Sequence, residues 1–132
     1  MKTEFSRKGN KMDTELGMKL FINKKFEHKG FTGIIKLQGF EAKPEIEYLI
    51  TNFQWYTGYV VIPKGHKLYE VEYHKIDVEV HGGLTYGRME SDDWVIGFDC
   101  NHDMDNTKYI TEDYVISEII HLINQINSVE TW

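Results

Sequence analysis

Residue types that can do chemistry are concentrated in one stretch of the chain, close to its only cysteine. Imidazole, thiol and carboxylate groups in one place are typical of a nucleophilic thiol with a histidine base, or of a metal ion held by nitrogen, sulfur and oxygen ligands. Two adjacent glycines add a third interpretation, because backbone without side chains lets a ligand approach closely. The residues concerned are His81, Gly82, Gly83, Asp99, Cys100 and His102.

The spacing of these residues limits the first two interpretations. A structural zinc site normally has paired Cys or His ligands at two places in the chain, and only Cys100-x-His102 approaches that pattern. We therefore expect no cofactor, and the ligand types leave a metal ion open. Adjacent strand residues point to opposite faces, so Asp99 and Cys100 would share a site only if the strand ends or bulges there. A lone cysteine closing an apolar strand is more typical of a small buried hydrophobe.

A β-hairpin would position these groups. Residues 78–86 and 94–98 both alternate apolar and polar side chains, which predicts two strands, and the acidic cluster at residues 90–93 between them predicts a turn. Antiparallel strands pair residues at a nearly constant sum of numbers. The end of the hairpin away from the turn would therefore bring His81 and Gly82 near Asp99 and Cys100, and His102 could join them.

Other segments predict the rest of the fold. Short runs with strand-forming residues, separated by glycine, proline or charged turns, predict strands over residues 19–23, 33–38 and 55–62, and residues 45–52 have a helical pattern. Thr111 is a good N-cap for a C-terminal helix with one apolar face. We expect a flexible basic leader over residues 1–14. Residues 15–132 are expected to form a single α+β domain, an antiparallel sheet of about five or six strands packed by the C-terminal helix.

Composition and charge exclude several classes of protein. The chain has 132 residues, of which 41% are hydrophobic and 14% aromatic, so a core needs no disulfides. It lacks a run of about 18 apolar residues, which predicts no membrane span and a cytoplasmic location. The formal charge is -6; residues 1–11 carry four basic and one acidic side chain, a net of +3, which leaves -9 for the remainder. An acidic body argues against broad nucleic-acid binding.

Two further features could contribute to a ligand site. Trp55, Tyr56 and Tyr59 lie on or beside one predicted strand, where they could pack in a core or stack on a planar ligand. His66 lies in a glycine-containing turn, from which it could reach a site.

Three blocks of sequence are similar to a known family. The blocks GYVVIPKGH (58–66), VHGGLT (80–85) and WVIGFDCNH (94–102) resemble a family of small, mostly uncharacterised bacteriophage and bacterial proteins, and the resemblance extends from Trp55 to the end of the C-terminal helix. The chain departs from the family at Lys67, where proline is usual, and at Met104, near which a glycine is usual. The resemblance implies that His66, His81, Gly82, Gly83, Asp99, Cys100 and His102 are site candidates. It also implies a phage accessory protein acting in the host cytoplasm.

We therefore expect a protein that binds a small, nucleotide-like ligand and so sequesters a host immune signal. The predicted ligand-binding residues are Trp55, Tyr56, Tyr59, His66, His81, Gly82, Gly83, Asp99 and His102. One alternative is a small hydrolase that uses His81, Asp99, Cys100 and His102, with or without a metal. Another is a protein-binding inhibitor that acts through its acidic surface. A homo-oligomer is left open.

Overall fold

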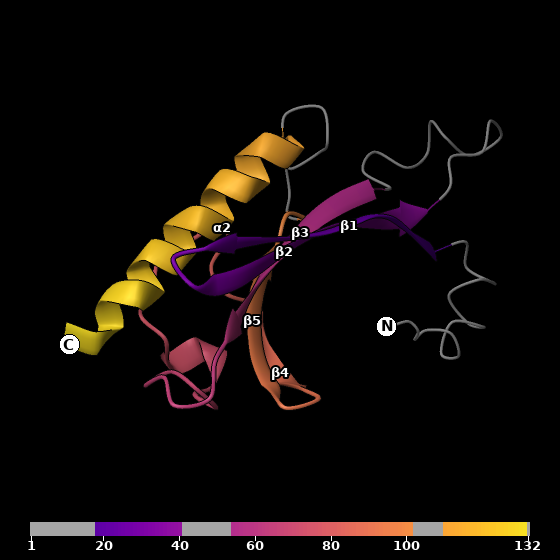
Figure 1. Cartoon of the computed structure of the whole chain (residues 1–132). Helices are drawn as coiled ribbons and strands as arrows, with labels where there is room; N and C mark the ends of the chain where they lie inside the picture. Colours follow the sequence, from indigo (N-terminus) through magenta and orange to yellow (C-terminus); the bar gives the residue numbers. More distant parts are fainter. Residues whose placement is uncertain (1–17, 41–53, 102–109, 132) are drawn as a thin grey trace, which may run out of the picture.

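The computed structural model describes residues 18–40, 54–101 and 110–131. In this part of the chain one helix, α2 (Glu112–Asn127), runs diagonally across one face of a five-stranded antiparallel sheet (Figure 1). The strands are β1 (Met18–His28), β2 (Phe31–Phe40), β3 (Gln54–Ile62), β4 (Tyr86–Glu90) and β5 (Asp93–Asp99), in the spatial order β1-β2-β3-β5-β4. The predicted α+β domain, with its C-terminal helix on one face of the sheet, is confirmed. The leader and the predicted helical segment at residues 45–52 lie outside the described residues.

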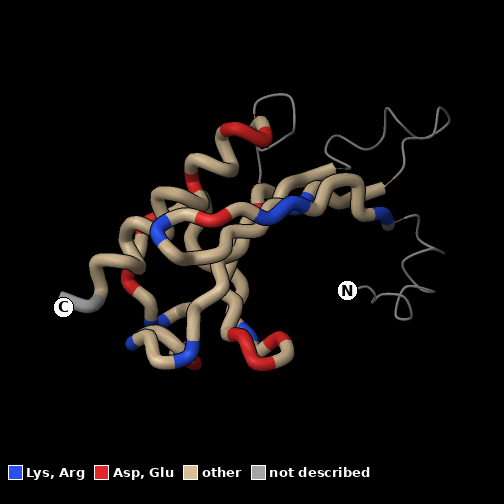
Figure 2. Tube along the Cα trace, in the orientation of Figure 1, with Lys and Arg blue, Asp and Glu red and all other residues tan. Residues whose placement is uncertain are grey.

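The helix begins where the sequence predicts. The Thr111 hydroxyl accepts a hydrogen bond from the Tyr114 backbone N–H at 3.1 Å, and Glu112 and Asp113 occupy the first turn, where acids interact favourably with the helix dipole. Figure 2 shows these acids at the start of α2, a second group of acids at the β4–β5 turn, and lysines along β1. The buried face of the helix consists of Val115, Ile119, Leu122, Ile123 and Ile126.

Two glycines let this helix approach the sheet closely. A Cβ atom on Gly33 of β2 would lie 2.8 Å from Cγ2 of Ile119, and a Cβ atom on Gly58 of β3 would lie 2.9 Å from Cγ1 of the same side chain. Carbon atoms cannot approach to these distances without displacing one another. The helix therefore packs directly on the backbone of β2 and β3, and neither glycine tolerates a side chain without a shift.

The predicted hairpin is right in its second strand and its turn but wrong in its first strand. The first strand is β4, at residues 86–90, and residues 78–85 lie in no strand. A turn at Gly82 and Gly83, both with positive φ, interrupts the segment, with the Gly83 N–H donating to the Val80 carbonyl at 2.8 Å. The alternating segment instead packs against helix α2.

Side chains of α2 bind the backbone of residues 79–81 as a neighbouring strand would. The Gln125 amide accepts from the Glu79 N–H at 2.8 Å and donates to the Glu79 carbonyl at 2.7 Å. Glu118 accepts from the His81 N–H at 2.9 Å. These bonds satisfy backbone groups that would otherwise need a sheet partner. An extended segment with a two-residue period therefore packs along a helix.

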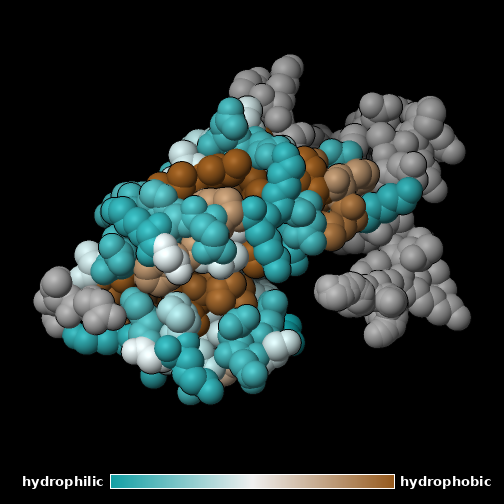
Figure 3. All heavy atoms as spheres, in the orientation of Figure 1, coloured by the Kyte–Doolittle hydropathy of each residue, from teal (hydrophilic) through white to brown (hydrophobic). Residues whose placement is uncertain are grey.

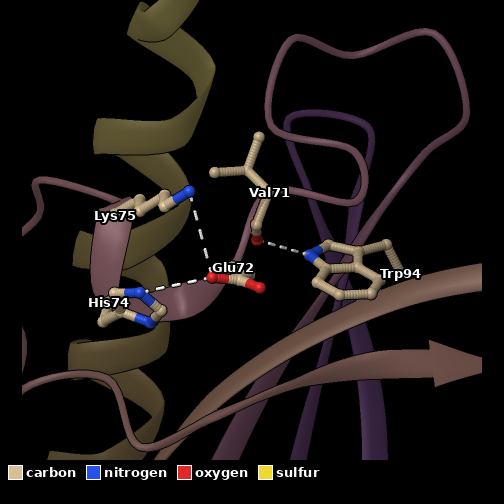
Figure 4. A network of polar contacts seen from close by, with 5 residues as sticks. All are labelled: Val71, Glu72, His74, Lys75 and Trp94. Atoms are coloured by element: carbon tan, nitrogen blue, oxygen red, sulfur yellow. Dashed lines mark hydrogen bonds and ion pairs between the residues drawn. The ribbon is translucent and has the colours of Figure 1, made fainter.

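The connection from β3 to β4 is fastened to the sheet through Trp94. Its indole N–H donates to the Val71 carbonyl at 3.1 Å, and Glu72 next to it lies 3.3 Å from Nε2 of His74 and 4.0 Å from Nζ of Lys75 (Figure 4). These last two residues belong to the short 3-10 helix η2 (Tyr73–Lys75).

Hydrophilic residues cover much of the visible surface, with apolar residues showing between them (Figure 3). In the part of the chain that the structure describes, no helix is long and apolar enough to cross a membrane.

Candidate functional site

The two faces of β3 have different roles because successive side chains point to opposite sides of the sheet. Tyr56 and Val60 lie on the side of Gly58, against α2, and both are buried in the core. The alternate side chains of the strand, Trp55, Thr57 and Tyr59, lie on the face that α2 does not cover. The site develops on this second face.

A cleft of about 480 Å³ opens there across β2, β3, β5 and the start of β4. Its aromatic walls come from Trp55, Tyr59 and Tyr86, and Phe98 also borders it. Its polar lining is Gln38, Thr57, Thr85, Asp99 and Asn101. Small-molecule sites in proteins have volumes of roughly 300–1,000 Å³ and combine apolar walls with a few placed polar groups, so this cleft is of ligand-binding size and composition.

Thr57 provides an unsatisfied hydroxyl in the cleft. Thr57 is only 4% exposed, and its hydroxyl oxygen has no hydrogen-bond partner among the described residues. Thr57 pairs directly with Asp99 across β3 and β5, so the two side chains are neighbours on one face. They nevertheless do not bond to each other. A buried hydroxyl without a partner costs about 1–3 kcal/mol.

Asp99 is held in a defined orientation by other donors. Its Oδ1 accepts from the Asn101 backbone N–H at 3.1 Å, and its Oδ2 accepts from the Thr85 hydroxyl at 3.1 Å. Because the two bonds involve different oxygens, they fix the orientation of the carboxylate. The result is a preoriented anionic acceptor in the cleft wall.

Tyr59 is held rigidly from several sides. A Cβ atom on Gly97, its partner on β5, would lie 2.5 Å from Cδ1 of the Tyr59 ring, so the ring lies directly on that glycine. The Tyr86 ring meets it edge-on, with centroids 5.3 Å apart, and the Lys36 ammonium lies 5.2 Å from its centroid. The Tyr86 hydroxyl in turn donates to the Glu90 carboxylate. Wall residues packed in this way form a preorganised surface.

Burial raises the pKa of both phenols. For Tyr59, the neighbouring Thr57 hydroxyl lowers the pKa, and the negative charges of Glu90 and Asp99 raise it. The Thr57 and Tyr59 oxygens are nevertheless not in hydrogen-bonding geometry in the structure. For Tyr86 the hydrogen bond to Glu90 raises the pKa further, because ionisation would break the bond and place two anions together. Both groups are therefore neutral hydrogen-bonding groups at physiological pH.

Of the residues predicted to bind a ligand, Trp55, Tyr59 and Asp99 line the cleft together. Tyr56 lies on the opposite face, under the helix, and is 8% exposed. Gly82 and Gly83 form the turn beside α2. His102 lies outside the described residues.

The predicted histidines lie elsewhere. His66 joins the end of β3 to the end of the helix: its Nδ1 accepts from the Leu68 N–H at 3.0 Å, so its Nε2 carries the proton that is donated to the Ile126 carbonyl at 3.2 Å. His81 lies against α2, where its Nδ1 shares a 2.8 Å hydrogen bond with the Tyr114 hydroxyl. The structure gives both imidazoles protein partners away from the cleft lining.

Cys100 is part of the core. It is 1% exposed, and its backbone N–H donates to the Tyr56 carbonyl at 2.9 Å, which continues the ladder for one residue beyond β5. Asp99 and Cys100 thus point to opposite faces, as strand alternation predicts, and the thiol does not join the carboxylate in one site. Among the described residues, no group of three or more His, Cys, Asp or Glu side chains could hold a metal ion.

Sequence reasoning missed several polar lining residues, namely Gln38, Thr57, Thr85 and Asn101. One signal was available, because Thr57 lies between Trp55 and Tyr59 and must share their face of the strand.

The fold and the cleft together define a small α+β domain in which a helix packs on one face of the sheet and a cleft opens on the other. No family model, curated protein or solved structure matches this chain.

Proposed function

We propose that this protein binds a small, nucleotide-like molecule in the cleft on the helix-free face of its sheet. The observation that carries the proposal is the buried Thr57 hydroxyl, which has no partner among the described residues and lines a cleft of about 480 Å³. Natural structures rarely leave a buried polar group unsatisfied, and such groups are found where a ligand or water completes the bonding.

The chemistry of the walls supports a planar, polar ligand. Trp55 offers an aromatic surface for stacking, and Thr57 and Asp99 offer a hydroxyl and a carboxylate side by side on neighbouring strands. The resemblance of three sequence blocks to a family of bacteriophage proteins, which no comparison tests, motivates a host-directed role, in which the ligand is a signal that the protein removes from the host cytoplasm. A hydrolase built on Cys100 is less well supported, because its thiol lies in the core.

Native mass spectrometry followed by denaturation tests this proposal. Protein purified without a metal-affinity tag should retain, or take up from a host extract, a small molecule that is released chemically unchanged. Trp55→Ala should abolish retention. Tyr73→Ala, which removes an exposed aromatic outside the cleft, should leave it intact. Equal loss in both variants, or release of a chemically altered product, would overturn the proposal.

Amide chemical-shift mapping locates the binding. Addition of the recovered ligand should shift the backbone signals of β3 and β5 around Thr57 and Asp99. Shifts confined to the helix or to the β1 edge would place the ligand elsewhere and refute the cleft as its site.

A further inference from the structure

We infer that the open edge of β1 binds an extended segment of a partner protein, in which acidic and apolar side chains alternate. Among the described residues β1 pairs only with β2, and the order β1-β2-β3-β5-β4 leaves it at one margin of the sheet. Backbone N–H and C=O groups at such a margin can pair with another chain, which then extends the sheet by one strand. This surface lies outside the cleft lining, so the inference goes beyond the proposed function.

The edge of β1 is long and regular. Residues 22–28 pair with β2 without interruption, from Ile22 opposite Leu37 to His28 opposite Phe31, and a register shift precedes this run. Seven residues of strand extend over about 24 Å, at roughly 3.4 Å per residue. The strand at the other margin of the sheet, β4, spans five residues. The edge of β1 therefore offers the longer ladder to an incoming strand.

Apolar side chains flank this edge. Of the four large hydrophobic side chains that the described residues expose, two are Leu20 and Phe21, with exposed fractions of 52% and 40%. Ile22 and Phe26 pack against the core from β1 and are only partly buried. Side chains on one face of neighbouring strands pack side by side, so apolar residues of an added strand would cover Ile22 and Phe26.

The distribution of charge selects an acidic partner. Residues 18–40, which form β1, β2 and the turn between them, carry five lysines and one glutamate, a net of +4. Residues 41–132 carry six basic and 17 acidic side chains, a net of -11. The glutamate, Glu27, accepts from the Thr32 hydroxyl of β2 at 2.8 Å, which holds it toward the sheet. The basic strip along β1 in Figure 2 would therefore attract acids and repel lysines.

The two faces of β1 offer different groups to a partner. Lys24 pairs with Glu112 of α2 at 2.8 Å, and the Phe26 ring lies where a side chain on Gly33 would meet it, beside Ile119. Strand alternation then places Lys25 on the helix-free face, where it is exposed and makes no ion pair with the described residues. A partner strand should therefore carry acids on one face and apolar residues on the other.

A second copy of this chain fits the edge less well than a different protein. Two β1 edges in contact would place lysines against lysines, and like charges across neighbouring strands are destabilising. The opposite margin, β4, covers fewer residues than the regular run of β1. Lysines on an edge strand commonly prevent self-association. Here they also leave a site that an acidic strand can occupy.

Fluorescence anisotropy with the full-length protein and labelled synthetic peptides tests this partner class. The probe is a short capped peptide of alternating valine and glutamate. One control has lysine in place of glutamate, and a second keeps the glutamates but is N-methylated at every residue, which removes its backbone N–H donors. We expect the probe to bind about 10-fold more tightly than either control, because the first control reverses the charges and the second cannot form a ladder.

Variants connect the preference to the edge. Lys25→Glu should weaken binding of the glutamate peptide about 10-fold and strengthen binding of the lysine peptide, a reversal that loss of structure cannot produce. Lys64→Glu, an exposed lysine in the turn after β3, should change neither affinity. Circular dichroism checks that both variants fold. Addition of the glutamate peptide should shift the backbone amide signals of residues 20–28 and leave those of β4 unshifted.

Several results would overturn this inference. They are equal binding of the three peptides, shifts confined to elements other than β1, and no reversal in Lys25→Glu. A dimer that the glutamate peptide dissociates would assign the edge to a second copy, and displacement of the peptide by a single-stranded oligonucleotide would assign the lysines to a nucleic acid. Trp55→Ala, which disables the proposed cleft, should leave peptide binding intact, so the two proposals fail separately.

Discussion

Replacing Thr57 by valine separates the contribution of its hydroxyl to folding from its contribution to binding. Valine has nearly the shape of threonine, and the position lies in the central strand β3, where β-branched residues are favoured. The side chain is 4% exposed and its hydroxyl has no partner among the described residues. The substitution therefore removes a buried polar group that makes no hydrogen bond with these residues. Leaving such a group unsatisfied costs about 1–3 kcal/mol.

We therefore expect Thr57→Val to raise the free energy of unfolding by about 1 kcal/mol, since part of the full penalty is relieved by local adjustment. Its ligand affinity should fall by about 3- to 10-fold, the equivalent of one neutral hydrogen bond. Urea unfolding followed by circular dichroism measures the first effect, and calorimetric titration measures the second. Thr57→Ser is the matched control: it keeps the hydroxyl and loses a methyl group, so it should lose stability and retain affinity.

The opposite pattern would refute the reasoning. If Thr57→Val is destabilised by more than about 1 kcal/mol and binds normally, the hydroxyl has a structural partner and no role in the cleft. The same result would remove the observation on which the proposed function depends.

Three further predictions concern the fold around the site. Gly58→Ala should lower the free energy of unfolding by about 1–3 kcal/mol in urea titrations, because its Cβ atom would lie 2.6 Å from Cζ of Phe98; unchanged stability would contradict the close packing. Gln125→Leu should increase the amide hydrogen exchange rate of Glu79, whose N–H it leaves without an acceptor, and Asn127→Leu, at an exposed position of the same helix, should not. The contribution of Tyr59 and Tyr86 to stability should be constant below the ordinary tyrosine pKa of about 10 and be lost above it, because the folded protein holds protons on these two groups that the unfolded chain releases. The ultraviolet absorbance of tyrosinate should rise for these tyrosines together with alkaline unfolding, and Tyr86→Phe should weaken the pH dependence of stability.

Local signals in the sequence are sufficient for most elements of the fold. The N-cap Thr111 and the apolar face of the helix depend only on neighbours along the chain, so the helix is predictable. Alternation identifies β3 and β5 in the same way. Residues 78–85 show the limit, because alternation reports that a segment is extended and half-buried without reporting what binds its backbone. Here Gln125 and Glu118 provide the partners, and nothing in the local sequence indicates it.

The candidate site was predictable only in part. Trp55, Tyr59 and Asp99 belong to strands that alternation predicts, but the pairing of β3 with β5, which brings them into one cleft, was not predicted. His66 and His81 were selected for their chemistry, yet their positions depend on distant contacts with Ile126 and Tyr114. The sequence indicates which face Thr57 occupies, through its place between Trp55 and Tyr59, but not that its hydroxyl is unsatisfied, since that is a property of the surroundings and not of the residue type.

The division of β3 into two faces affects how this protein can diversify. The residues that pack against the helix alternate one by one with those that line the cleft, and the two sets share only the backbone between them. Substitutions at positions 55, 57 and 59 can therefore reshape the cleft while positions 56, 58 and 60 preserve the core. A lineage carrying this domain could change the cleft by altering one side of a single strand, without first acquiring compensating changes in its interior.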